Sequence, residues 1–318
     1  MSTIEQAAKR LDELKRAGMS LSGGYTLTAD SAGGEGYFAG DFSQTEDSLS
    51  REIDRTVEQV VELDSARPPH NDDSTRHVDI DLLALAARSF ITPESSHSQL
   101  ADEFRVIKRP LLVNARGDGI APIRNGNMIM VTSSLPGEGK SFTSINLAMS
   151  IAMEMDLRVL LVDADIAHSS VLNYLGLPKS KGLLDVLLDE TIDLSDVLLR
   201  TNVEKLSILP GGGHYKHATE LLASESMRRL IEEITSRYSD RIIIFDSPPL
   251  LVTTESRVLA THMGQIVMVV EAGKTPHAAV KQALKTIESC PVVLMMLNKS
   301  AATNSGGYGY AGYGYGTY

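Results

Sequence analysis

The sequence predicts a doubly wound α/β domain, in which helices cover both faces of a mostly parallel sheet, over roughly residues 100–300. Apolar runs of strand length recur without the polar–apolar alternation of a half-exposed strand, which is typical of strands buried on both faces. The intervals between these runs have helical periodicity, as in β-α-β units. A chain of 318 residues with 42% hydrophobic residues is also long enough to bury such a core.

The expected strands and helices alternate along the chain. We expect strands at residues 128–133, 158–165, 206–210, 241–247, 265–272 and 292–299. The expected helices lie at 98–115, 140–154, 182–188, 219–238, 254–262 and 276–289. Because a helix connects most successive strands, the strands are expected to run parallel.

The first 97 residues lack this pattern. Residues 22–48 are rich in Gly, Ser, Thr and Asp, a composition typical of a flexible segment. Apolar residues recur at helical spacing within 4–14 and 53–61, which predicts one or two amphipathic helices. We interpret residues 1–97 as a flexible leader, either a plain tether or an arm that docks on a partner or a subunit. The globular domain is then expected over 98–303.

Residues 304–318 are expected to form a disordered tail, because their Gly- and Tyr-rich composition cannot pack a core. This tail holds five of the ten tyrosines of the chain, Tyr308, Tyr310, Tyr313, Tyr315 and Tyr318.

Composition excludes several classes of protein. With 30 basic and 41 acidic residues, the net charge of −11 disfavours a nucleic-acid-binding role, which needs clustered Lys and Arg. The single cysteine, Cys290, excludes an internal disulfide framework and fits a reducing compartment. No apolar run reaches the ~18 residues that span a bilayer, and the first residues lack the apolar block of a secretory signal. We therefore expect a cytoplasmic protein.

Residues 134–141, SLPGEGKS, form the strongest motif. They match the phosphate-loop spacing G-x-x-x-x-G-K-[ST] with serine in place of the first glycine. Gly137 and Gly139 let backbone N–H groups face phosphate oxygens, and the next helix adds the positive end of its dipole. Lys140 is expected to reach the β- and γ-phosphates of a nucleotide, and the Ser141 hydroxyl to ligate Mg²⁺.

Three aspartates stand at the carboxyl ends of expected strands. Asp163 and Asp165 end one strand, and Asp246 ends another, in the manner of a Walker B carboxylate. An aspartate at such a position is often only a turn former or helix cap. Because ligands bind at this edge of doubly wound sheets, the three together favour a role in holding Mg²⁺ and orienting the attacking oxygen.

The motifs SSLPGEGKS, LLVDAD and IIFDSPP, with the tyrosine-rich tail, resemble the bacterial tyrosine kinases of exopolysaccharide operons. The stretches 104–112, 217–224 and 246–276 are similar to the tyrosine autokinases found beside exosortase-A (PEP-CTERM) loci, and the resemblance covers about residues 98–318. It implies a P-loop NTPase fold of the deviant Walker type, as in partition ATPases. It also implies an ATP- and Mg²⁺-dependent autokinase that modifies its own tail in trans within an oligomer.

The resemblance implies roles for individual positions. Catalysis would depend on Lys140, Asp163, Asp165 and Asp246, with Asp163 activating the phenol. Mg²⁺ would be held by Ser141, Asp165 and Asp246. ATP would contact Gly137, Glu138, Gly139, Lys140, Ser141, Phe142 and Asn298, the last beside the adenine. The phosphate acceptors would be Tyr308, Tyr310, Tyr313, Tyr315 and Tyr318.

The resemblance also implies partners. A membrane-embedded polysaccharide co-polymerase would activate the kinase and recruit it to the inner face of the membrane. The kinase would form a ring-like homo-oligomer, and a phosphotyrosine phosphatase would oppose it. The spacing of Asp102, Arg105 and Lys108 resembles the family's subunit-contact helix, although a plain solvated face explains it equally well. Ala167 departs from the family, which often has a basic residue at this position.

Three other functions fit the sequence less well. A partition- or septum-type ATPase switch shares the fold, but such proteins have a lysine early in the loop, where this chain has Leu135, and no tyrosine tail. A non-catalytic nucleotide binder would not need an intact set of Lys140, Asp163 and Asp246. A dinucleotide oxidoreductase is disfavoured because no G-x-G-x-x-G motif follows the first expected strand.

Overall fold

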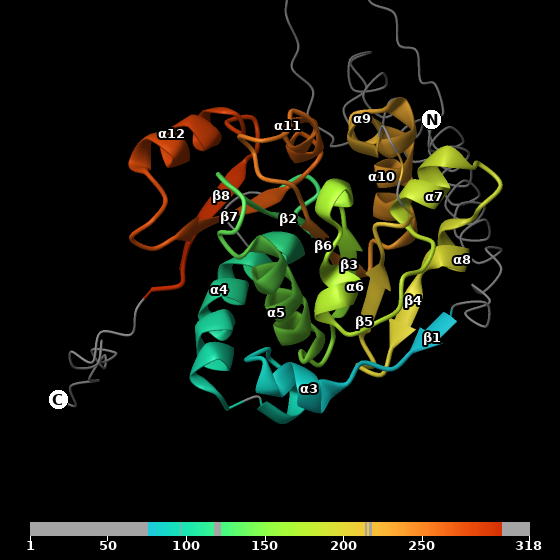
Figure 1. Cartoon of the computed structure of the whole chain (residues 1–318), viewed down its shortest axis with the longest axis horizontal. Helices are drawn as coiled ribbons and strands as arrows, with labels where there is room; N and C mark the ends of the chain where they lie inside the picture. The colour runs from blue at the N-terminus through green and yellow to red at the C-terminus, as the bar shows by residue number, and fades with distance from the viewer. Residues whose placement is uncertain (1–75, 96, 118–121, 214, 216–217, 301–318) are drawn as a thin grey trace, which may run out of the picture. The chain divides into compact units, whose positions relative to one another are not determined.

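The computed structural model describes residues 76–95, 97–117, 122–213, 215 and 218–300, which form a doubly wound α/β domain around one sheet (Figure 1). Its described strands are β1 (Arg76–Val78), β2 (Met128–Ser133), β3 (Arg158–Asp163), β4 (Leu199–Thr201), β5 (Leu206–Leu209), β6 (Arg241–Asp246), β7 (Gln265–Glu271) and β8 (Val292–Asn298). They are ordered β1-β4-β5-β3-β6-β2-β7-β8. Every neighbouring pair is parallel except β4 and β5. The predicted fold class is confirmed.

Helices pack on both faces of the sheet and divide the core into two layers. One layer contains α3 (Leu82–Ala87), α4 (Gln99–Arg116), α5 (Lys140–Ala152) and α6 (Val171–Tyr174). The other contains α7 (Leu183–Leu188), α8 (Leu194–Val197), α9 (Ala218–Leu222), α10 (Glu225–Arg237), α11 (Glu255–Ala260) and α12 (His277–Lys285). Two 3₁₀ turns, η2 (Pro93–Ser95) and η3 (Ile166–His168), complete the described set.

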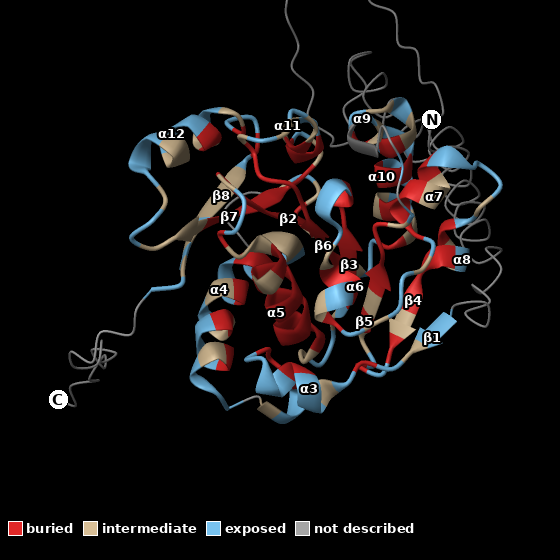
Figure 2. Cartoon of the chain, viewed as in Figure 1, coloured by how far each residue is buried: buried red, intermediate tan, exposed pale blue. Residues whose placement is uncertain are grey.

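Strand β2 shows why the sequences of the strands are continuous apolar runs. Ile129 and Val131 pack into the layer of α5, whereas Met128 and Met130 pack into the layer of α10. Successive side chains of a strand point to opposite faces, so a strand covered on both faces needs apolar residues at every position. Figure 2 shows the same burial in α5, which lies against the sheet with most of its residues buried.

The expected strands and helices are present, and the structure adds short elements that were not predicted, among them helices α3, α6 and α8. Strands β1 and β4 were not predicted, because segments of three residues carry no periodic signal. The expected helix at 219–238 is two helices, because Ser224 starts a new one by accepting a hydrogen bond from the Met227 backbone N–H at 3.2 Å. Among the described residues, no helix is both long enough and apolar enough to cross a membrane.

The predicted boundary at residue 97 is wrong, because residues 76–95 belong to the folded domain. β1 pairs with β4. The Asn202 side chain holds the following residues in place, since it accepts a hydrogen bond from the Ile80 backbone N–H and donates one to the Ile80 carbonyl, both at 3.0 Å. Ile91 is fully buried, and its backbone N–H donates to Asn146 Oδ1 on α5 at 2.7 Å. Residues 1–75, with the expected amphipathic helices, and residues 301–318, with the tail, lie outside the described residues.

A solvated face is wrong for Lys108, whereas the subunit contact of this helix stays a prediction. Lys108 is buried between α4 and α5, where its Nζ donates to the Ser150 carbonyl at 2.6 Å and pairs with Glu154 Oε1 at 2.6 Å. A buried ammonium needs such partners, since an unpaired buried charge is very costly. Lys108 therefore connects two helices, while Arg105 pairs with Asp102 on the same helix.

Replacing a buried side chain in residues 76–95 should destabilise the whole domain. We expect Ile91→Ala to lower the free energy of unfolding by about 2–5 kcal/mol, as for other buried aliphatic truncations. Leu83→Ala, on the same segment but 76% exposed, should change it by less than about 0.5 kcal/mol. Urea denaturation followed by circular dichroism measures both. Equal, small effects would mean that residues 76–95 are not part of the cooperative unit.

Candidate active site

The loop between β2 and α5 has the backbone that a phosphate site requires. Gly137 and Gly139 have φ angles of 82° and 100°, in the left-handed region that favours glycine. A Cβ on Gly139 would also lie 2.1 Å from Asn298 Nδ2, so a larger residue would have to displace the Asn298 side chain. Gly139 begins α5 directly, which places the helix N-terminus and the side chains of Lys140 and Ser141 at the loop.

The side chains of Glu138 and Asn298 hold this loop in place. Glu138 is buried, and its carboxylate accepts hydrogen bonds from the Leu135 backbone N–H at 2.6 Å and from the Thr275 hydroxyl. Asn298, at the end of β8, donates from Nδ2 to the Glu138 carbonyl at 2.9 Å. Lys299 donates to the Gly137 carbonyl at 2.6 Å. Both Glu138 and Asn298 therefore support the loop; the adenine contact expected of Asn298 stays a prediction.

Asp163 and Asp246 lie opposite each other at the ends of β3 and β6. The two residues are partners in the parallel register, and both are fully buried. Asp163 Oδ2 accepts hydrogen bonds from Ser169 Oγ at 2.7 Å and from two backbone N–H groups of the following loop. Asp246 Oδ1 accepts from Ser144 Oγ of α5 at 3.1 Å. Each carboxylate is thus fixed through one oxygen.

Burial raises the pKa of both carboxyl groups. Desolvation, together with repulsion from Asp246, raises the pKa of Asp163 to about 7, against the lowering effect of its hydrogen bonds. Desolvation raises the pKa of Asp246 to about 6, and attraction to Lys140 opposes this rise. Two carboxylates so close cannot both ionise freely, so the pair retains a proton up to near-neutral pH.

Lys140 and Asp165 bring opposite charges to the same place. Lys140 Nζ lies 2.7 Å from Asp165 Oδ2, and both side chains are largely buried. One oxygen on each of Asp163, Asp165 and Asp246 is buried without a hydrogen-bond partner. In the described part of the chain, no group of three His, Cys, Asp or Glu side chains is arranged to hold a metal ion by itself. Unpartnered carboxylate oxygens beside a phosphate loop fit Mg²⁺, which takes its remaining ligands from water and phosphates.

These groups open into a cavity of about 940 Å³. Of the predicted residues, Gly137, Gly139, Lys140, Ser141, Phe142, Asp165 and Asn298 line it. Asp163 and Asp246 lie behind this wall, and the predicted tyrosine acceptors lie outside the described residues. Ala167, the position that departs from the family, also lines the cavity and adds no charge to it.

Sequence reasoning missed several residues of this site. Arg88, Phe90 and Tyr174 form an aromatic and cationic wall of the cavity, with the Arg88 guanidinium over both rings. Two of these belong to the segment assigned to the leader, where no motif marked them. Ser144 gave a weak signal, because it lies one helical turn after Ser141 and so faces the same side of α5.

Removing the charge of Asp163 should stabilise the nucleotide-free domain at alkaline pH. A carboxyl with a raised native pKa contributes stability below its unfolded pKa, and this contribution is lost as the pH rises through the native value of about 7. Asp163→Asn should therefore raise the free energy of unfolding by about 1–4 kcal/mol at pH 8 and change it little near pH 4. Thermal and urea unfolding at both pH values measure this.

Asp156→Asn, which neutralises an exposed carboxylate, is the matched control and should have no such pH dependence. A lower stability of Asp163→Asn at pH 8 would show that the Asp163 charge is stabilised in the native state, contrary to this account.

Comparison with known proteins identifies related chains. A family model described as an AAA domain matches residues 126–298. The tyrosine-protein kinase YwqD of Bacillus subtilis (strain 168) is 31% identical over 191 residues, which cover 59% of this chain and 79% of that protein. The tyrosine-protein kinase CpsD of Streptococcus agalactiae is 32% identical, with 60% of this chain and 83% of that protein covered.

Solved structures agree with these relatives. The crystal structure of the chimerical protein CapA2B2 matches with a TM-score of 0.56 and 27% identity, over 65% of this chain and 89% of that one.

Longer curated relatives also match, and there the aligned part makes up 25% of their length. With its phosphate loop, its strand-end carboxylates and these relatives, the chain belongs to the bacterial tyrosine kinases within the AAA-domain family.

Proposed function

We propose that this kinase uses Mg²⁺·ATP to phosphorylate the tyrosines of its own residues 304–318 and, through this modification, regulates exopolysaccharide synthesis or export. The observation that supports it best is the cluster of three buried carboxylates, those of Asp163, Asp165 and Asp246, near Lys140. This cluster lies at the edge of the cavity that the phosphate loop lines. An ATPase switch would also use this loop, so the acceptor distinguishes the two functions.

The chain's own residues suit phosphoryl transfer to a phenol. A tyrosine has an ordinary pKa near ~10 and is a weak nucleophile at neutral pH, so it needs a base and correct placement. Asp163, with a pKa raised to about 7, would accept the phenolic proton as the phenol oxygen attacks the γ-phosphorus and the bond to the ADP oxygen breaks. Lys140 would neutralise charge on the transferring group.

Ser141, Asp165 and Asp246 would hold Mg²⁺. The ion would supply positive charge against the phosphate oxygens when bound. Ser141 suits this role because its Oγ faces the cavity next to Ser170 Oγ, at 3.1 Å.

The described part of the chain lines the cavity shortly before the proposed acceptor tail begins. Asn298 and Lys299 line the cavity, and Tyr308 follows ten residues after Asn298. A flexible linker of ten residues spans about 16–19 Å on average, so reach alone permits modification in cis. The family resemblance favours transfer between subunits of a ring-like oligomer. We also propose a membrane-embedded co-polymerase as activator, recruitment through it to the inner face of the membrane, and a phosphotyrosine phosphatase as the opposing enzyme.

Lys140→Met should abolish tyrosine phosphorylation without unfolding the domain. Loss of a preorganised cation at the transferring phosphate costs on the order of 100-fold or more in rate. Lys281→Met, an exposed lysine of α12, is the matched control and should keep full activity. Phosphotyrosine is measured by mass spectrometry after incubation with Mg²⁺·ATP, and folding by circular dichroism. Wild-type phosphotyrosine in Lys140→Met would remove this lysine from the proposed site.

Transfer between subunits is tested by mixing two proteins, one without kinase activity and one without the acceptor tail. One protein carries Lys140→Met and an intact tail, and the other is active but lacks residues 306–318. Phosphotyrosine on the Lys140→Met chain is the expected result, because neither protein can modify its own tail. If none forms, while the truncated protein still binds ATP and associates with its partner, modification occurs in cis or the chain is an ATPase switch.

A further inference from the structure

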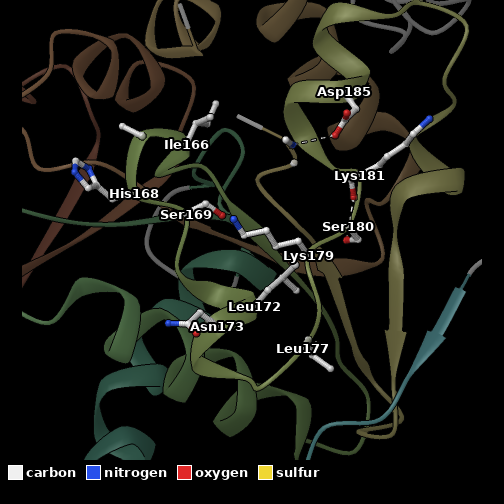
Figure 3. A pocket seen from close by; sticks show the side chains of 13 residues that line it. Ile166, His168, Ser169, Leu172, Asn173, Leu177, Lys179, Ser180, Lys181 and Asp185 are labelled. Atoms are coloured by element: carbon white, nitrogen blue, oxygen red, sulfur yellow. Dashed lines mark hydrogen bonds between the residues drawn. The ribbon is translucent and has the colours of Figure 1, made fainter. Parts of the chain in front are cut away.

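A second cavity of about 700 Å³ adjoins the first (Figure 3). Ala167 and His168 line both cavities, so η3 forms the wall between them. Ser169 lines the second cavity and donates its hydroxyl hydrogen to Asp163 Oδ2 at 2.7 Å. The second cavity therefore lies directly behind the loop that positions the proposed base.

The lining of this cavity combines an apolar floor with two ammonium groups. Ile166, Leu172 and Leu177 supply the apolar surface, and Lys179 and Lys181 supply the charge. Figure 3 shows the Lys179 side chain reaching across the cavity toward Ser169. Among the residues that the structure describes, Lys179 forms no ion pair, whereas Lys181 is attracted to Asp189 outside the cavity lining.

The one carboxylate in the described wall is already engaged. Asp185 Oδ2 accepts hydrogen bonds from the backbone N–H groups of Gly182 at 2.8 Å and Gly213 at 3.4 Å. It closes the turn at the start of α7 and leaves the Lys179 ammonium group available to an anion. The cavity thus suits a ligand with an apolar ring and a strong negative charge.

We propose that this second cavity binds a phosphorylated tyrosine of the chain's own residues 306–318, with the ring on the apolar floor and the phosphate against Lys179. The Lys181 side chain points away from Lys179 in Figure 3 and adds positive charge from farther away. The proposal rests on the proposed autokinase function. Residues 306–318 contain no charged side chain, so a phosphate is the feature that distinguishes a modified tail from an unmodified one. Each phosphate adds about −1.5 to −2 charges, to which two ammonium groups are complementary.

Binding here would couple successive modifications. Neighbouring tail tyrosines are two or three residues apart, which is about 7–10 Å of extended chain. A phosphotyrosine held behind η3 would keep the same tail at the kinase while the next tyrosine enters the catalytic cavity. One encounter would then yield a multiply phosphorylated tail.

Peptide binding to the full chain carrying Lys140→Met tests the site without any transfer reaction. The probes are a peptide of residues 306–318 with one phosphotyrosine, the unphosphorylated peptide, and inorganic phosphate. We expect the phosphopeptide to bind at least about fivefold more tightly than the unphosphorylated peptide, and this advantage to shrink as salt is added. Adding Lys179→Ala and Lys181→Ala should abolish the advantage, whereas Lys281→Ala, on the exposed surface of α12, should preserve it.

Equal affinity for both peptides, or an advantage that survives loss of both lysines, would overturn the proposal. If inorganic phosphate displaced the phosphopeptide at the same concentration as unlabelled phosphopeptide does, the cavity would be an anion site that does not recognise the ring, contrary to the proposal. In the otherwise wild-type chain, Lys179→Ala with Lys181→Ala should leave the first phosphorylation unchanged but accumulate singly phosphorylated tails. Because the peptide already carries its phosphate, a failed kinase reaction and a failed binding site give different results.

Discussion

The ion pair between Lys140 and Asp165, beside the buried pair of Asp163 and Asp246, is the constraint on which the site depends. Three carboxylates and one ammonium leave an excess of negative charge in a region that excludes water. The protein tolerates this in part by retaining a proton, as the raised pKa values of Asp163 and Asp246 indicate. A bound cation would relieve the same excess, so the free energy lost in burying these groups would favour the binding of a cation.

Sheet topology brings these groups together. β6 lies between β3 and β2 in the sheet, although it follows both in the chain. The carboxyl ends of three parallel strands therefore place the phosphate loop, Asp163 and Asp246 at one edge. The segment after β3 forms η3, whose residues Ala167 and His168 line both cavities.

Much of the fold and of the loop could be predicted, because each depends on local pattern. The buried strands are apolar at every position, and the glycines at 137 and 139 are demanded by backbone angles alone. The place of residues 76–95 in the folded domain was not predicted. β1 is short, and the packing of this segment depends on contacts with Asn146 and Asn202, far along the chain. The burial of Lys108 was not predicted, because its charge is neutralised by Glu154, far along the chain just after α5, which no spacing reveals.

The most direct test of the account is the ratio of phosphotyrosine formed to ADP released by the purified full chain in Mg²⁺·ATP. Both products can be quantified from one reaction, phosphotyrosine by mass spectrometry and ADP by chromatography. A kinase in which Asp163, Lys140 and the metal act on a phenol predicts a ratio near one until the acceptor tyrosines are consumed, followed by a stop in ADP release. Continued ADP release with little phosphotyrosine would contradict the account and identify the chain as an ATPase switch.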